Sequence, residues 1–225
     1  MIDFDEMVSN HLKREFRPRE VGRYYPSDIG GCLRKTFYRY KFPQEIDPAL
    51  AKIFEMGNLM HEFVVDVLKS EKNPDIELLK SEFPFKEQID DFLISGRIDN
   101  LILVKSANKS ILVEVKSTKN IEYITGPSPS NIVQVQLYMH YLGVHDGILL
   151  YIDKRDLRTR IFDVKYSERE ALAVIEKFKR LHTHLKENNI PSPEARMIEQ
   201  TLWMCRFCEY SDRCYKETPK SKEWL

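Results

Sequence analysis

Hydrophobic positions change their spacing several times along the chain, and each change predicts a new secondary-structure element. Spacings of three and four, opened by helix-start signals such as Asp47-Pro48 and Ser128-Pro129, predict helices. Alternating or continuous apolar runs predict strands. The expected helices cover residues 27–40, 47–70, 128–142 and 167–190, and the expected strands cover 77–86, 92–104, 111–117, 147–153 and 159–164.

Two of the expected helices have well-defined apolar stripes that we expect to face the core. The stripe of the first is Ile53, Met56, Met60, Phe63 and Val67. The stripe of the second is Leu172, Ile175, Phe178, Leu181 and Leu185. Helices and strands alternate in this order, which predicts one α/β domain with a mixed central sheet flanked by helices.

Composition agrees with a globular protein. Of 225 residues, 42% are hydrophobic and 31% are charged, which is too apolar for a disordered chain. Basic and acidic residues are equal at 35 each, so the protein is not a binder that acts through overall positive charge. Residues 11–41 nevertheless carry nine Lys and Arg against three acids, and this basic segment fits contact with a phosphate backbone.

No secretion or membrane signal is expected. The first ten residues are acidic without an apolar run, and the longest uncharged stretch, 123–145, contains two prolines and several polar residues. We therefore expect a cytoplasmic, soluble protein without a membrane partner.

The most informative segment is Gly96-Arg97-Ile98-Asp99 followed by Glu114-Val115-Lys116. A symmetric turn between residues 105 and 110 would place Asp99 opposite Lys116 and diagonal to Glu114, within roughly 8 Å. Two such carboxylates could share a Mg²⁺ ion, with Lys116 holding the attacking water or offsetting charge on a phosphate. This arrangement predicts metal-assisted phosphodiester hydrolysis. The alternative is a surface hairpin with solvated ion pairs.

Two helices offer further candidates. His61 could be a third metal ligand, with Gly57 one turn earlier leaving room for a metal or phosphate, although a lone helical histidine is more often a core residue. Gln134 and Tyr138 lie four apart on the helix after the Glu-x-Lys strand and share a face. They could hold a phosphate or a base, or simply be part of an amphipathic helix. Tyr24, Tyr25 and Phe37 could stack on bases or belong to the core.

The four cysteines form a metal-binding pattern. Cys205, Cys208 and Cys214 cluster near the C-terminus, and Cys32 is a distant fourth. Zinc and iron–sulfur clusters both accept four thiolates. Cys32 could instead be a buried cysteine of an apolar helix. A shared metal would join segments separated by about 170 residues and so close a very long loop.

These motifs together resemble the RecB-like nucleases of the PD-(D/E)XK superfamily, and more closely the CRISPR-associated exonuclease family numbered four. Its cluster cysteines match Cys32, Cys205, Cys208 and Cys214. Its nuclease motifs match in order across roughly residues 24–216: His61, Asp99, Glu114 with Lys116, and Gln134 with Tyr138. Gln136 leaves the glutamine of the last motif ambiguous.

The resemblance implies a restriction-endonuclease-like core over about residues 45–190 and an iron–sulfur-stapled region from about 24–44 and 191–216. It implies catalytic roles for Asp99, Glu114, Lys116, Gln134 and Tyr138. The implied ligands of Mg²⁺ or Mn²⁺ are His61, Asp99, Glu114 and the backbone carbonyl of Val115. The cluster is expected to be 4Fe-4S rather than 2Fe-2S.

The implied activity is exonucleolytic cleavage of DNA, mainly single-stranded and 5′-to-3′, in CRISPR spacer acquisition with the integrase; a homo-oligomer is compatible with it. A second hypothesis is a non-catalytic DNA-binding module with a structural zinc or iron–sulfur site, in a larger DNA-processing complex. A third is a zinc-stapled structural partner of such a complex. The intact set of Asp, Glu and Lys argues for the nuclease.

Overall fold

A mixed β-sheet lies at the centre of the computed structural model, which describes residues 2–13 and 15–218. Its six strands within the described residues are β1 (Arg23–Tyr24), β2 (Ile76–Ile89), β3 (Phe92–Val104), β4 (Lys109–Thr118), β5 (Asp146–Asp153) and β6 (Thr159–Lys165). The longer helices are α1 (Phe4–Leu12), α2 (Leu33–Lys41), α3 (Pro48–Lys69), α4 (Pro129–Leu142) and α5 (Glu168–Lys186). The predicted alternation of helices and strands is confirmed.

The strands follow the order β1-β3-β4-β5-β6, and β2 also pairs with β3. The pairs β1–β3 and β4–β5 are parallel, while β2–β3, β3–β4 and β5–β6 are antiparallel. Helix α4 lies in the crossover that returns the chain from β4 to its parallel neighbour β5, as parallel neighbours require. The sheet is therefore mixed, as the sequence predicted.

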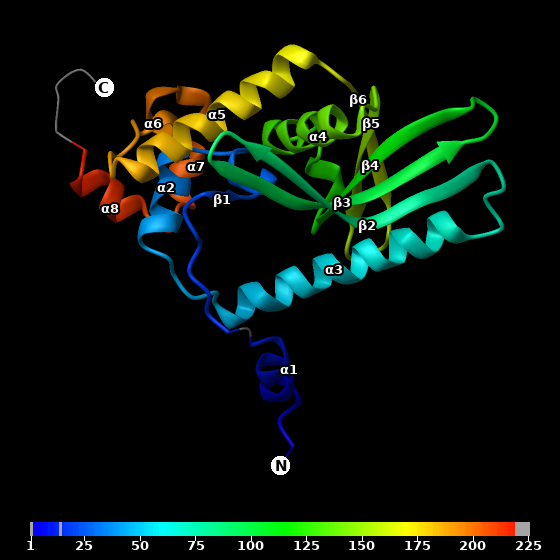
Figure 1. Ribbon diagram of the computed structural model, residues 1–225. Helices are drawn as coiled ribbons and strands as arrows, with labels where there is room; N and C mark the ends of the chain where they lie inside the picture. The colour runs from blue at the N-terminus through cyan, green and yellow to red at the C-terminus, as the bar shows by residue number, and fades with distance from the viewer. Residues whose placement is uncertain (1, 14, 219–225) are drawn as a thin grey trace.

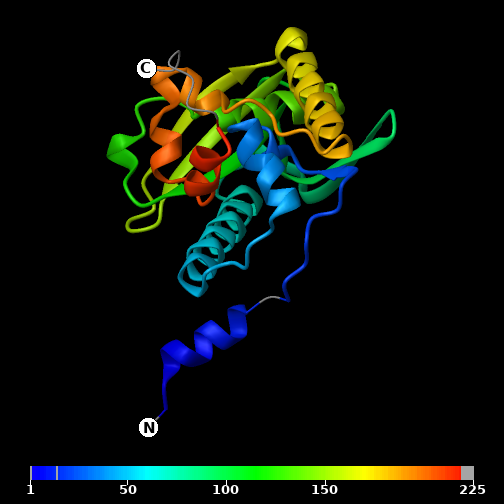
Figure 2. The same cartoon turned by 90° about the vertical axis from the view of Figure 1, so that its left-hand side faces the viewer.

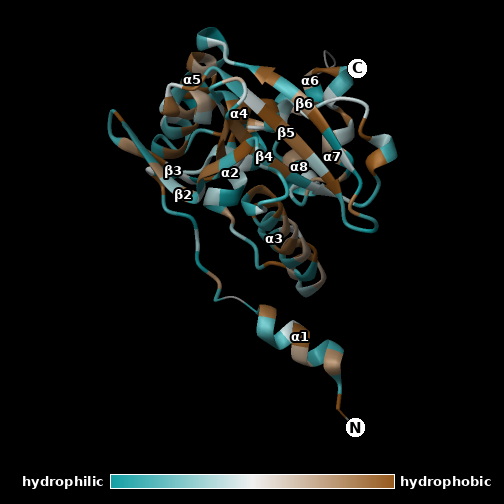
Figure 3. Ribbon diagram, turned by 90° about the vertical axis from the view of Figure 1, so that its right-hand side faces the viewer, coloured by the Kyte–Doolittle hydropathy of each residue, from teal (hydrophilic) through white to brown (hydrophobic). Residues whose placement is uncertain are grey.

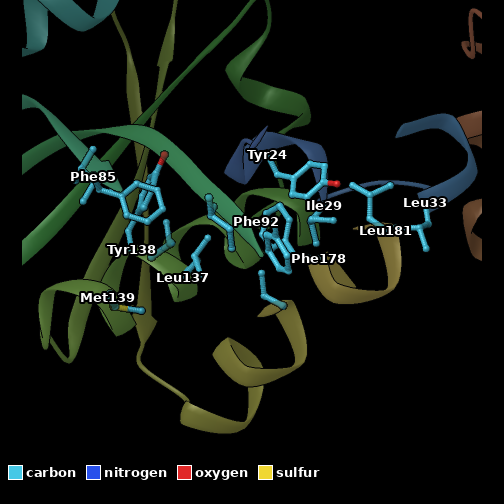
Figure 4. Close-up of a cluster of buried hydrophobic side chains, with 14 of the residues drawn as sticks. Tyr24, Ile29, Leu33, Phe85, Phe92, Leu137, Tyr138, Met139, Phe178 and Leu181 are labelled. Atoms are coloured by element: carbon cyan, nitrogen blue, oxygen red, sulfur yellow. The ribbon is translucent and has the colours of Figure 1, made fainter. Parts of the chain in front are cut away.

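Helices cover both faces of the sheet, with α3 on one side and α4 and α5 on the other (Figure 1). The larger core lies on the α4 and α5 side; its buried residues include Tyr24, Phe85, Tyr138 and Phe178 (Figure 4). A smaller core, which includes Val64 and Val115, lies between α3 and the sheet. Burial of these apolar side chains is the main force that fixes the helices against the sheet.

The first predicted helix is wrong in its start. Residues 26–28 form a short 3₁₀ turn, and α2 begins at Leu33, so Cys32 is its N-cap and not an interior residue. The intervening Gly30 packs against the first turn of α4, where a Cβ would lie 2.5 Å from that of Ser130. This close approach requires glycine and holds the backbone between the two segments.

The predicted apolar stripe of α3 is largely wrong. Val64 is buried, but Ile53, Met56, Phe63 and Val67 are each about two-fifths exposed. The helix is long and covers the sheet with only part of its apolar surface, so hydrophobic residues remain along it (Figure 3). In α5, Leu172 is also exposed, because the buried stripe begins at Ala171 instead.

Helix α2 and the C-terminal segment lie side by side, as expected for a shared metal site. The C-terminal segment contains short helices α6 (Glu194–Met197), α7 (Trp203–Arg206) and α8 (Ser211–Lys216). It is tied to α2 by an ion pair of Lys35 with Glu209 at 2.7 Å and by hydrogen bonds from Leu33 N to Glu194 and from Arg34 to Pro191 O. Helix α1 projects away from this assembly (Figure 2). Over the described residues, no helix has both the length and the apolar character needed to cross a membrane.

The basic segment predicted for DNA binding is mostly used internally. Arg19 pairs with the buried Asp28, and Lys35 and Arg39 share Glu209. Tyr24 and Phe37 are fully buried, so their core interpretation is confirmed. Part of the local positive charge therefore stabilises the fold through these ion pairs.

Candidate functional site

The hairpin of β3 and β4 brings the predicted acids together in a register that differs from the prediction. The turn is residues 105–108, with Asn108 at φ 47°, and Val104 pairs with Lys109. Asn100 is therefore opposite Val113, and positions summing to 213 rather than 215 are paired. The ladder ends there, and the Asp99 Oδ2 atom accepts a hydrogen bond from Val115 N at 2.8 Å. Asp99 thus lies beside Glu114 rather than opposite Lys116.

Three side chains from three elements meet above this hairpin. Ligand atoms of His61 from α3, Glu82 from β2 and Asp99 from β3 lie within 4.8 Å of one another. His61 Nδ1 is 3.5 Å from Asp99 Oδ1 and 3.6 Å from Glu82 Oε1. His61 therefore lies beside Asp99, and its role as a metal ligand stays a prediction. Glu82 was missed, because it occupies an irregular position in β2 with φ 47° that strand alternation does not predict.

Glu114 has the most unusual environment of these acids. Its side chain is 1% exposed, and its Oε2 atom is buried without a hydrogen-bond partner among residues 2–13 and 15–218. Burial raises the pKa of Glu114 to about 7, helped by the negative charge of Asp99 and opposed by Lys116 and His61. Burying a carboxylate oxygen without a hydrogen bond costs free energy. A bound ligand, such as a cation, would offset that cost.

Lys116 is held in place from two sides. Its Nζ atom donates to Glu114 Oε1 at 2.7 Å and to Gln134 Oε1 at 3.0 Å. Gln134 donates to the Tyr138 hydroxyl, which in turn donates to Arg97 O. Burial lowers the pKa of Lys116, but the charge of Glu114 outweighs it and the net shift is upward. We call His61, Glu82, Asp99 and Glu114 the acid cluster. Lys116 is a fixed cation at its edge.

The two glutamines of α4 have different hydrogen-bond partners. Gln136 is buried on another side of α4, where it donates to Lys165 O and accepts from Ser167 N. It therefore connects α4 to the start of α5, whereas Gln134 contacts Lys116. A backbone carbonyl ligand from Val115 stays a prediction.

The acid cluster fits a divalent cation. Carboxylate and imidazole ligands suit Mg²⁺ and Mn²⁺, and Asp99, Glu82 and His61 are already within a shared ligand shell. Glu114 lies outside that group of three, but its charge interacts with both Asp99 and His61. Burial lowers the pKa of His61, yet the hydrogen bond and charge of Asp99 raise it above its usual value. A bound cation would replace that proton and satisfy Glu114.

The four cysteines converge at a second site. Cys32, Cys205, Cys208 and Cys214 line one cavity of about 280 Å³. Burial raises the pKa of the Cys205 thiol, and the other three cysteines add to that shift. Positive charge borders the cavity, since Arg34 Nη1 lies 3.7 Å from Cys214 Sγ. Burial raises the pKa of the Cys208 thiol, and the charge of Lys35 only partly opposes this shift. This donor set fits a group held by four thiolates.

The sulfur spacing is wider than a closed zinc site needs. Four thiolates around tetrahedral zinc, with Zn–S bonds near 2.3 Å, have sulfurs about 3.8 Å apart. Within residues 2–13 and 15–218, no three cysteine sulfurs lie within 4.8 Å of one another. The open cavity between them favours a larger group than a single zinc ion.

Comparisons with known proteins agree with this geometry. Residues 29–215 match the sequence model of the PD-(D/E)XK nuclease superfamily. The structure of SSO0001 is similar at 22% identity and a TM-score of 0.61, with 95% of each chain covered. The alkaline exonuclease LHK-Exo from Laribacter hongkongensis is similar at 13% identity and a TM-score of 0.52, with 90% of this chain and 97% of that chain covered.

LHK-Exo in complex with dAMP is similar at 14% identity and a TM-score of 0.52, over 83% of this chain and 93% of that one. Comparison with curated proteins gave no match. At these identities the structural likeness shows a shared fold.

Proposed function

The chain belongs to the PD-(D/E)XK nuclease superfamily, and from this premise we propose that it is a metal-dependent exonuclease that degrades single-stranded DNA from its 5′ end. The proposed site residues are Asp99, Glu114, Lys116, Gln134, Tyr138 and His61, with the Val115 carbonyl as a further metal ligand. Glu82 joins them from its position in the structure. The exonuclease name of LHK-Exo supports the reaction class.

One observation supports the proposal more than any other. In the part of the chain that the structure describes, Glu114 Oε2 is buried without a hydrogen-bond partner, next to Asp99 and His61 and beside the cation of Lys116. A merely structural Asp–Glu–Lys hairpin would satisfy this oxygen or expose it to water. Its burial without a partner disfavours the non-catalytic DNA-binding alternative, which has no use for it.

The roles of the side chains follow from their positions. Asp99, His61, Glu82 and Glu114 would hold Mg²⁺ or Mn²⁺, which when bound lowers the pKa of a water and polarises the phosphate. Lys116 keeps its charge because Glu114 and Gln134 anchor it, so it can orient the attacking water and offset charge that develops on the phosphate. Tyr138 fixes Gln134 through its hydroxyl.

The cysteine cavity supports an iron–sulfur cluster, because four thiolates line one cavity. The choice of 4Fe-4S over 2Fe-2S comes from the sequence resemblance. We place its role in the structure of the protein, since it would fasten α2 to the C-terminal segment. The sequence resemblance adds a role in CRISPR spacer acquisition with the integrase as partner, and it is compatible with a homo-oligomer.

Polarity and strand preference are tested together with labelled DNA. The purified protein is incubated in Mn²⁺ with oligonucleotides labelled at the 5′ or the 3′ end, as single strands and as blunt duplexes. We expect early release of the label as a short product from 5′-labelled single strands, a ladder of progressively shortened 3′-labelled strands, and slow attack on duplexes. The opposite end pattern, or faster duplex cleavage, would contradict the proposed polarity or preference.

A further inference from the structure

A groove borders the acid cluster on one side of α3. It is lined by Ile53, Phe54, Gly57, Asn58, His61, Ser117 and Lys154, and its volume is about 450 Å³. His61 belongs to both the groove and the cluster. The groove therefore opens directly onto the proposed reaction centre.

Gly57 keeps the groove open between Phe54 and His61. The three residues are spaced three and four apart, so they follow one side of α3, and Phe54 lies about 10.5 Å along the helix axis from His61. A Cβ on Gly57 would lie 3.6 Å from Ser117 Oγ. That distance is an ordinary van der Waals contact, so glycine is not sterically required here, but its missing side chain adds space to the groove between His61 and Phe54, a residue that is 49% exposed.

Two lysines provide positive charge at the groove: Lys154 lines it, and Lys119 is close enough for its charge to add to the burial that lowers the pKa of Lys154. Lys119 and Lys154 directly follow β4 and β5, which are parallel and paired through Thr118 and Asp153. Ligands of open α/β sheets bind beyond such carboxyl ends of strands. The Lys154 ammonium donates to Ile53 O at 3.1 Å, and neither lysine has an acidic ion-pair partner among the described residues.

We infer that this groove binds the nucleotide adjacent to the cleaved phosphodiester, with its base stacked on Phe54 and its phosphate at Lys154 and Lys119. The inference rests on the proposed function and assigns it a strand-selecting subsite. The faces of a paired base are covered by its neighbours in a duplex, so Phe54 can stack only on an unpaired base. The groove thus provides a physical reason for single-strand preference.

The stacking role is tested by binding, with catalysis switched off. The affinity of the wild type, Phe54→Ala and Phe63→Ala for a fluorescent oligothymidine is measured in EDTA. Phe63 is a matched control, since it is a similarly exposed phenylalanine of α3 outside the groove. We expect Phe54→Ala to weaken binding by about fivefold or more, with little change in duplex affinity, and Phe63→Ala to match the wild type.

The phosphate role is tested in the same assay by varying salt. Lys154→Gln should reduce the slope of log affinity against log salt by about 0.7, as expected for one lost single-strand phosphate contact. Lys69→Gln, at the far end of α3, should leave the slope unchanged.

Unchanged oligothymidine affinity in Phe54→Ala, or an equal loss in Phe63→Ala, would overturn the inference. Hydrolysis of bis(p-nitrophenyl) phosphate by the wild type in Mn²⁺, a phosphodiester without a base, tests the proposed chemistry separately. If Phe54→Ala binds oligothymidine normally but the wild type hydrolyses the model phosphodiester, the groove inference is rejected and the proposed function is retained. If Phe54→Ala loses affinity but the wild type does not hydrolyse the model phosphodiester, only the proposed chemistry is rejected.

Discussion

The acid cluster and the cysteine cavity are built in opposite ways. The cluster depends on regular elements, because β3 and β4 form one hairpin and α3 crosses beside it. The cavity is built at irregular positions, since Cys32 caps a helix and the other three cysteines lie in or between short helices. The first site can form without a bound group, whereas the second gathers thiols from the two ends of the chain.

Because of this difference, substitutions at the two sites should have different effects on activity and on stability. Loss of a side chain from the cluster removes chemistry from a framework that the sheet still holds. Loss of a thiolate from the cavity removes a cross-link between segments about 170 residues apart, whose closure entropy is large. Activity and stability should therefore respond to different substitutions.

The largest expected effect is the loss of activity in Glu114→Gln. The substitution removes one ligand charge while preserving the shape of the side chain, so single-stranded DNA cleavage should fall by more than about a hundredfold. Thermal unfolding and iron content should stay near those of the wild type. Glu122→Gln is the matched control, because the Glu122 side chain is exposed and its carboxylate pairs with Arg158 rather than with a residue of the cluster. Cleavage by Glu114→Gln at the wild-type rate would show that Glu114 of the acid cluster is not needed for the reaction.

Cys205→Ser should have the opposite profile. The wild-type protein should be brown, with visible absorbance near 400 nm, and the variant should lose colour and stability together because thiolate ligation is coupled to folding. The loss is expected to be about 4–5 kcal/mol if a covalent cross-link of similar loop length is a guide. Met204→Leu is the control in the same helix. A colourless wild type with one zinc per chain would reject the iron–sulfur cluster and leave the hairpin unaffected.

Lys116→Gln distinguishes chemistry from binding within the cluster. Because Lys116 is anchored by Glu114 and Gln134, we expect single-turnover cleavage to fall by about a hundredfold or more with DNA affinity nearly unchanged. Affinity and single-turnover rate are measured on the same preparation. If affinity and its salt dependence fall while the rate at saturation is retained, Lys116 is a phosphate-binding residue instead.

The smallest effect concerns pH. With the pKa of Glu114 raised to about 7 by burial and Asp99, the metal-free carboxyl is mostly protonated below pH 7 and ionised above it. A cation must displace this proton and also that of His61, whose pKa burial lowers but Asp99 raises above its usual value. Mn²⁺ affinity should therefore rise by about tenfold per unit or more up to pH 7, and level off above the pKa values of both groups. Calorimetric titrations at pH 6, 7 and 8 measure this dependence. A flat affinity across that range would show that Glu114 is already ionised in the metal-free protein.

Most of the fold was predictable from sequence because periodicity reports element type directly. The hairpin shows why the site was also predictable despite a wrong register. Side chains alternate with a period of two, so a shift of two in the pairing sum left Asp99 and Glu114 close together. The sequence also predicted that the four cysteines lie together. Three of them are close in sequence, and this spacing is typical of metal-binding sites.

Other features depend on tertiary geometry that a pattern does not contain. Periodicity predicted an apolar stripe on α3, but it does not show how much of that stripe the sheet can cover. Met56 and Phe63 were therefore wrongly expected to be buried. Glu82 enters the cluster through an irregular backbone position. Phe54 lies outside the predicted stripe, and only the packing of α3 beside the end of β4 reveals the groove.

The central claim is most directly tested by digesting end-labelled single-stranded DNA with the wild type in Mn²⁺, in EDTA, and in EDTA followed by excess Mn²⁺, with Glu114→Gln in parallel. We predict cleavage by the wild type in the first and third conditions alone, and cleavage by Glu114→Gln that is at least about a hundredfold slower in those two conditions. Cleavage in EDTA, or equal rates for the two proteins in Mn²⁺, would contradict this prediction.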